Sequence, residues 1–191
     1  MAAVATAWAA YQSARWHSEQ AKGQSASIAA RVESTRAANV ANRQAQIDVA
    51  LFTQWVDSYA TDDTELARFY RRRFRLEFRP AFVAWVATKP RTNSNAPLSP
   101  FAMPQYKLAA TAQAEDLERQ AAAASQSVGT YIQRADDYSL AVVLFAAALF
   151  FAGISTRLRS FKLRMVIVGL GYALFLGSVI WIATFPVTLS V

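Results

Sequence analysis

The chain has 191 residues, no cysteine and a formal charge of +7, and 54% of its residues are hydrophobic. The lack of cysteine excludes a disulfide framework and a thiolate metal site. All 13 acidic residues precede residue 138, and the basic residues between 17 and 137 leave that segment nearly balanced, at 15 − 13 = +2. The basic excess is therefore a weak signal for nucleic acid, and we predict no nucleic-acid partner.

Residues 1–16 open the chain with an apolar and aromatic segment that contains Val4, Trp8 and Tyr11. A helix of about 14 residues spans about 21 Å, which is too short to cross a bilayer. No basic region precedes the apolar residues, so a signal peptide is not indicated. We expect either the outer part of an N-terminal transmembrane helix, completed by residues upstream of this sequence, or a short interfacial anchor.

Residues 17–137 are predicted to form an extracytoplasmic helical domain. Alanine and other helix formers dominate its first part, and Ile47, Leu51, Trp55 and Tyr59 recur every four residues. This spacing predicts a long helix with one apolar face at its end. His17, the single histidine, lies near the expected membrane surface, where interfacial packing is its expected role.

A second helix is predicted over residues 61–87, because acidic residues at 62, 63 and 65 form a helix-start pattern. Pro80 predicts a kink or a restart after Arg79. The candidate surface for an anionic lipid or an acidic partner consists of Arg68, Arg71, Arg72, Arg75 and Arg79. The alternative is an ordinary solvated face whose arginine stems cover apolar surface.

The proline-rich loop 88–104 contains four prolines and is followed by a predicted helix that continues into the membrane. Phe101 and Met103 are expected either to pin this loop to the aromatic helix or to leave it as a mobile tip. After the loop, apolar residues recur at alternating spacings of four and three at Ala110, Ala114, Leu117, Ala121, Ala124, Val128, Tyr131 and Ala135. This heptad pattern predicts a coiled-coil-like arrangement, either antiparallel with residues 21–50 or with a neighbouring copy.

The C-terminal third predicts a transmembrane helical hairpin, with one span over residues 138–156, a second over 165–185 and a short external tail over 186–191. The loop 157–164 carries the topology determinants Arg157, Arg159, Lys162 and Arg164. Short basic loops stay in the cytoplasm, so residues 17–137 are expected outside a bacterial inner membrane. Arg15 and Lys22, at the outer end of the first apolar segment, argue for the opposite orientation, but we give the four-cation loop more weight.

Small residues on both spans predict how the hairpin packs, because they let helices approach closely in lipid. One ridge contains Ala148 and Ala152, and the other contains Gly169, Ala173 and Gly177. In an antiparallel hairpin we expect Ala152 to meet Gly169 and Ala148 to meet Ala173.

Several short segments resemble a group of bacterial inner-membrane proteins that have one N-terminal span, a long helical external segment and a C-terminal pair of spans. The segments that carry the resemblance are residues 13–16, 51–55, 78–82, 100–104, 134–138 and 150–157. The resemblance implies a first span longer than residues 1–14, and it implies no activity.

We therefore expect an all-α integral membrane protein without enzymatic activity, and no catalytic, cofactor-binding or metal-binding residues. Its expected role is that of an accessory or scaffold subunit, which self-associates or docks to a larger membrane complex through the helical domain. The first alternative is a homo-oligomeric channel with a pore lined by Ser155, Ser178 and Thr184. The second alternative is a membrane-bound enzyme with an unrecognised site.

Overall fold

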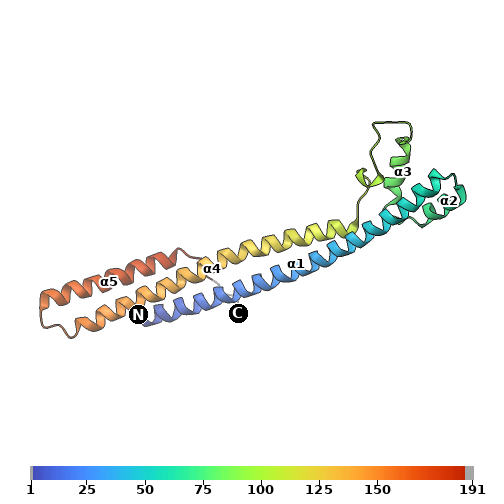
Figure 1. Ribbon diagram of the computed structural model, residues 1–191. Coiled ribbons are helices and arrows are strands. Elements are labelled where there is room, and N and C mark those ends of the chain that lie inside the picture. Colours follow the sequence, from blue (N-terminus) through green and yellow to red (C-terminus); the bar gives the residue numbers. More distant parts are fainter. Residues whose placement is uncertain (1, 188–191) are drawn as a thin grey trace. The chain divides into compact units, whose positions relative to one another are not determined.

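The computed structural model describes residues 2–187, and every regular element in that part of the chain is helical (Figure 1). Its α-helices are α1 (Ala2–Ala60), α2 (Thr64–Arg73), α3 (Arg79–Ala87), α4 (Ala109–Ser155) and α5 (Phe161–Ala183). A 3₁₀ turn, η1, covers Pro100–Ala102. The chain divides into two compact units, one of Met1–Ile28 with Ala122–Val191 and one of Ala29–Ala121, and we call them unit 1 and unit 2.

Unit 1 contains the start of α1, most of α4 and all of α5. Ser13 and Ser139 share a hydrogen bond of 2.9 Å between their hydroxyls. A Cβ at Gly23 would lie 2.9 Å from the Cγ2 of Val128, so glycine is needed for this close approach. The α1 residue with the higher number, Gly23, meets the α4 residue with the lower number, Val128. The two helices therefore run antiparallel in this unit.

The core of unit 1 is mainly aromatic side chains and alanine. Its buried members are Ala9, Trp16, Ala135, Tyr138, Ala141 and Phe145. From α5, Phe175 packs against this core, with its ring centroid 5.7 Å from that of Phe145. Alanine between the large rings brings the helix backbones close, so the packing depends on shape more than on large apolar area.

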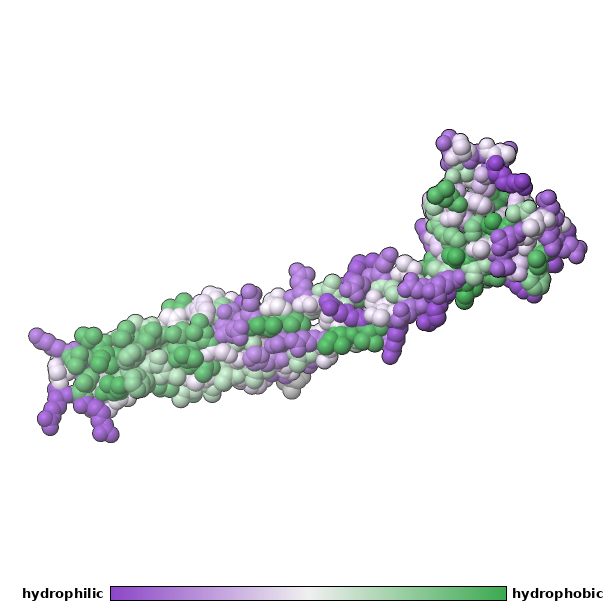
Figure 2. All heavy atoms as spheres, viewed as in Figure 1, coloured by the Kyte–Doolittle hydropathy of each residue, from purple (hydrophilic) through white to green (hydrophobic). Residues whose placement is uncertain are grey.

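Two helices in the described part of the chain are long and apolar enough to cross a membrane, namely α4 and α5. Only 11% of the most apolar 18-residue segment of α5 is buried within the protein. Figure 2 shows apolar residues gathered over α4 and α5 next to the turn that joins them, with hydrophilic side chains at the turn itself. Unit 1 therefore leaves a large apolar surface uncovered.

Unit 2 has an aromatic core where the end of α1, α2, α3 and the loop after α3 meet. The buried large residues are Trp55, Phe74, Phe78, Phe82 and Trp85. The loop is held to this core, since the Nε1–H of Trp85 donates to the carbonyl of Pro97 at 2.7 Å, and Phe101 and Met103 pack against the cluster. Of the two alternatives for Phe101 and Met103, packing against the aromatic helices is the one that the structure shows.

The helix expected over residues 61–87 is interrupted. Asp63 caps α2 by accepting from the N–H of Leu66 at 2.9 Å, which confirms the predicted start. The helix then ends at Arg73 because Phe74 takes an extended backbone, with ψ of 136°. A new helix begins at Arg79 with Pro80 in its first turn, where proline has no N–H to lose from the helix.

Candidate functional site

The most unusual polar group in unit 2 is the carboxylate of Asp48, which lies on α1 with its side chain fully buried. Its Oδ2 accepts from the guanidinium of Arg75 at 2.9 Å and from the hydroxyl of Tyr106 at 3.2 Å. Its Oδ1 is also buried but has no hydrogen-bond donor. One turn earlier on α1, the Oε1 of Gln44 is a second buried acceptor without a donor. Buried acceptors of this kind are rare, so the pair marks the polar centre of the unit.

The turn between α2 and α3 supplies the positive charge. Arg75 contacts Asp48 through one terminal nitrogen and Glu77 through the other. Glu77 in turn accepts from the N–H of Ala109 at 3.0 Å, so it satisfies a free donor at the first residue of α4. The network thus ties α1, the α2–α3 turn and the start of α4 together through four charged or polar side chains.

The network contains two carboxylates and one guanidinium, and this imbalance affects its ionisation. Burial raises the pKa of Asp48, and the neighbouring Arg75 partly opposes the rise. Burial and the negative charge of Asp48 raise the pKa of Tyr106 to about 12. Both shifts favour the protonated forms of the two side chains, and the contacts of the network join the helices.

The predicted arginine surface is only partly assembled. Arg75 is withdrawn into the network with Asp48, and Arg79 donates to the backbone carbonyls of Phe74 and Arg72 at 2.9 and 3.0 Å. Arg75 is therefore half-buried within this network, whereas Arg79 stays exposed while it contacts the backbone of the α2–α3 turn. Binding of the five arginines to anionic lipid or an acidic partner stays a prediction.

Three arginines of the predicted set, Arg68, Arg71 and Arg72, remain exposed on α2. Arg68 and Arg72 line a shallow hollow together with Asp63 and Glu65, so the local charge is mixed. Arg73 lies over the ring of Phe69, 3.4 Å from its centroid. Arg71, Arg72 and Arg73 lie in the last turn of α2, where positive charge interacts favourably with the helix dipole. These three arginines therefore stabilise the helix.

The packing of α5 on α4 differs from the predicted ridge. Ala148 is buried as expected, but its carbonyl faces Gly171, where an added Cβ would lie 3.3 Å away. Gly169 and Gly177 have open space at the same position, and Ala152 and Ala173 are exposed. The pairing of Ala152 with Gly169 and of Ala148 with Ala173 is therefore wrong. The contact surface of α5 is rotated, and its buried residues are Gly171 and Ser178.

Ser155 and Ser178, two of the residues expected to line a pore in the channel alternative, are both buried within the chain. Their hydroxyls donate to the carbonyls of Ala152 and Leu174 at 2.6 and 2.8 Å. Thr184 likewise donates to the carbonyl of Trp181 at 2.7 Å. The hydroxyl hydrogens are thus used within the helices themselves, and the burial of Ser155 and Ser178 in the single chain leaves these two little exposed surface.

Residues 157–164, which we call the α4–α5 turn and which include the first residues of α5, contain the four topology residues. Arg157, Arg159, Lys162 and Arg164 are all exposed, and none takes part in an ion pair within residues 2–187.

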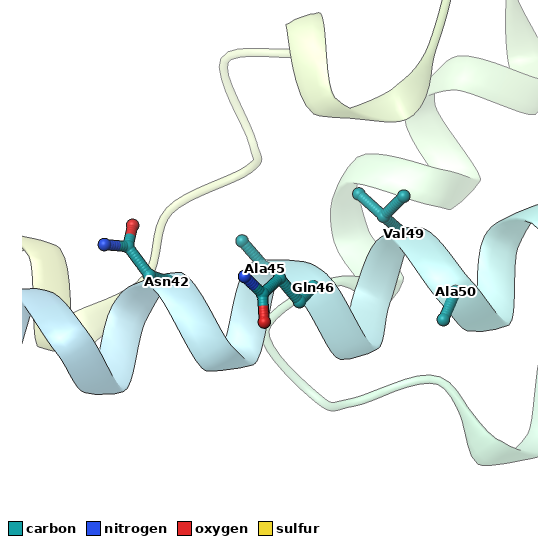
Figure 3. A pocket seen from close by; sticks show the side chains of 5 residues that line it. All are labelled: Asn42, Ala45, Gln46, Val49 and Ala50. Atoms are coloured by element: carbon teal, nitrogen blue, oxygen red, sulfur yellow. The ribbon is translucent and has the colours of Figure 1, made fainter.

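A separate shallow hollow on the outer side of α1 is lined by Asn42, Ala45, Gln46, Val49 and Ala50 (Figure 3). This hollow is open and lacks charged groups, so we assign it no chemistry.

Sequence reasoning missed Asp48, Gln44 and the Ser13–Ser139 contact. The signal was present in the spacing, because Ser27, Ser34, Ala41, Asp48 and Trp55 follow one another every seven residues. All five are buried or half-buried, and Ser34 donates to the carbonyl of Ala114 at 3.0 Å. A polar residue at such a position predicts a buried contact between helices.

Comparisons of the chain with protein-family models, with curated proteins and with solved structures gave no match. The resemblance to inner-membrane proteins thus remains an expectation from short segments. The function is argued below from the residues and their geometry.

Proposed function

We propose that the protein is a non-enzymatic integral membrane protein that acts as an accessory or scaffold subunit. The second half of α4 and α5 cross the inner membrane of a bacterium as a hairpin. Residues 17–137 project from the extracytoplasmic side as a helical domain, in which α1 and α4 pair in a coiled-coil-like antiparallel manner. This domain self-associates or docks to a larger membrane complex.

The observation that carries the proposal is the exposed apolar surface of α5. Val166, Tyr172 and Ile180 are 67%, 63% and 67% exposed, and they lie on a helix that contacts α4 along one narrow face. Water penalises apolar area by roughly 25 cal/mol per Å². A surface of this size on a helix of 23 residues is favourable in hydrocarbon and unfavourable in water.

The dimensions of unit 1 support the same placement. From Tyr138 to Ser155, α4 rises about 26 Å, and α5 rises a similar distance from Arg164 to Trp181. Tyr138 and Trp181 therefore lie at one level and the basic turn at the other. Aromatic residues favour the membrane interface, and short basic loops favour the cytoplasm.

The helical pairing supports a scaffold role for residues 17–137. The heptad positions of α4 are buried or half-buried, and contacts to α1 occur in cis in each unit, at Gly23 with Val128 and at Ser34 with Ala114. The Asp48 network and the aromatic core hold the helices of unit 2 together. Its polar groups are engaged in holding helices together, which favours docking over catalysis.

Because the chain has no cysteine, single cysteines can test the topology cleanly. Ser94→Cys lies on the exposed loop after α3, and Ser160→Cys lies on the exposed α4–α5 turn. In intact spheroplasts a membrane-impermeant maleimide should label the first variant, and it should label the second only after permeabilisation. Val166→Cys, as the control within the apolar surface, should stay unlabelled in both cases.

The reverse labelling pattern would overturn the orientation. Free labelling of Val166→Cys in the membrane fraction would overturn the span itself. Native mass measurement in mild detergent then separates self-association from attachment to a larger complex. A monomer that copurifies with no other protein would contradict the scaffold role.

A further inference from the structure

The turn between α4 and α5 concentrates positive charge that no acidic side chain of residues 2–187 neutralises through an ion pair. Its four cations fall within eight residues, at Arg157, Arg159, Lys162 and Arg164. No acidic residue follows Asp137, which lies about 27 Å from the end of α4 along the helix. At physiological salt, interactions between exposed charges that lie more than about 8 Å apart are largely screened. The charge of the turn must therefore be balanced from outside the chain.

Apolar side chains alternate with these cations. Phe161, Leu163 and Met165 are 74%, 49% and 60% exposed, and the exposed apolar residues of α5 begin directly after them. A partner for this turn must offer negative charge and hydrocarbon within a few ångströms of each other. Nucleic acid and an acidic protein surface offer the charge but leave Phe161 and Leu163 in water. The headgroup region of an anionic bilayer offers both.

The start of α5 points in the same direction. Its first turn contains Lys162 and Arg164 but no acidic residue, and the side chain of Ser160 makes no capping hydrogen bond. Cations at this end of a helix oppose the helix dipole. The arrangement becomes favourable when phosphate groups lie alongside the cations.

We infer that the α4–α5 turn is a docking surface for anionic phospholipid headgroups, with Arg157, Arg159, Lys162 and Arg164 as the phosphate-binding side chains. The inference rests on the proposed membrane insertion and goes beyond it, since it assigns a lipid class to the turn. It also moves the anionic-lipid surface away from α2, where the sequence alone had suggested it.

The test uses the full chain, purified in mild detergent and reconstituted into nanodiscs of phosphatidylcholine. Spin-labelled phosphatidylglycerol and spin-labelled phosphatidylcholine are compared for the fraction that the protein immobilises. A cation at a membrane surface gives about a fivefold preference for anionic lipid. After averaging over all lipids around the protein, we expect a selectivity of at least about threefold. Both leaflets of a nanodisc have the same lipids, so the result does not depend on orientation.

The decisive variant replaces the four cations with glutamine, R157Q/R159Q/K162Q/R164Q, and its selectivity should fall to about one. The matched control, R68Q/R71Q/R72Q, removes the exposed cations of α2 and should keep the wild-type value. The charge-preserving variant R157K/R159K/R164K should also keep most of it, which guards against a fold defect. Sodium chloride at 0.5 M should reduce the selectivity, whereas inorganic phosphate at constant ionic strength should not.

Three results would overturn the inference: unchanged selectivity in the four-glutamine variant, loss of selectivity in the α2 control alone, or competition by inorganic phosphate, which would indicate a site for free anions. Failure of the proposed function looks different. In that case alkaline carbonate would strip the wild-type protein from membranes. A chain that resists carbonate but shows no lipid preference contradicts only the docking surface.

Discussion

The Asp48–Arg75 pair allows a quantitative test of how unit 2 is held together, through the substitution Arg75→Met. Asp48 is fully buried, and Arg75, which is 22% exposed, is the one cation paired with it within residues 2–187. Removing one partner of a buried pair typically costs about 3–5 kcal/mol. Protonation limits this loss, because a carboxyl with an ordinary pKa of 3.8 takes up a proton at pH 7 for about 4 kcal/mol and at pH 5 for about 2 kcal/mol. We expect a loss of about 3 kcal/mol at pH 7 and less than about 2 kcal/mol at pH 5.

Asp48→Asn provides the matched comparison, since it keeps the shape but removes the charge that needs a partner. Arg75 then still pairs with Glu77, so we expect a loss of about 1 kcal/mol or less. In the double variant, Arg75→Met no longer leaves an unpaired buried charge. The two substitutions should therefore be coupled by about 2 kcal/mol, as expected for residues in direct contact.

Hydrogen–deuterium exchange of the full chain measures this effect separately in each unit. Peptides from residues 48–108 of the Arg75→Met variant should exchange about a hundredfold faster than wild type at pH 7, since 1.4 kcal/mol corresponds to a factor of ten. Peptides from α5 should be unchanged. If the Arg75→Met and Asp48→Asn variants lose equal protection, or if the Arg75→Met effect is the same at pH 5 and pH 7, the idea of a buried charge pair is refuted.

Three further predictions concern the same packing. The folded-state pKa of both Asp48 and Tyr106 is raised, so each group contributes stability that is present below its unfolded pKa and lost as the pH rises through its folded pKa. The hydrogen-exchange protection of unit 2 should therefore fall towards pH 12, and Tyr106→Phe should remove the part of this fall that comes from the tyrosine. Gly171→Val should break the α4–α5 contact, because a Cβ there already lies 3.3 Å from the carbonyl of Ala148, whereas Gly169→Val should leave thermal stability in detergent unchanged. Phe78→Ala should destabilise unit 2 by about 3–5 kcal/mol, because this fully buried ring packs against several other rings, and α5 peptides should show no change in exchange.

The heptad of α4 was predictable because its apolar residues alternate with polar ones. Ala114, Ala121, Val128 and Ala135 are all buried, as the spacing indicated. The matching face of α1 was harder to recognise, because it is built from serine, alanine and Asp48 instead of large apolar residues. Hydropathy cannot separate such a face from a solvated one. The relevant information is side-chain volume, since small residues bring two backbones together whether or not they are apolar.

The α2–α3 turn was only partly predictable for a different reason. Pro80 fixes the start of α3, and the sequence indicated this restart. The break after Arg73 places Arg75 in contact with Asp48, which lies 27 positions from it in the chain. Local propensity carries no information on such a contact. An uninterrupted helix would have placed Arg75 beside Arg68 and Arg72, and the buried carboxylate would then have lacked its cation.

The packing of α5 was the least predictable feature, because almost every side chain on this helix is apolar. In water, a helix packs through its apolar face, because burying that face is favourable. In hydrocarbon all apolar faces are equivalent, and only the fit between surfaces distinguishes them. Three glycines lie on α5, but only at Gly171 would an added Cβ meet α4, while Gly169 and Gly177 look onto open space. Glycine spacing therefore shows which faces of α5 permit close approach, and the shape of Phe145, Ala148 and Phe151 on α4 decides which face is used.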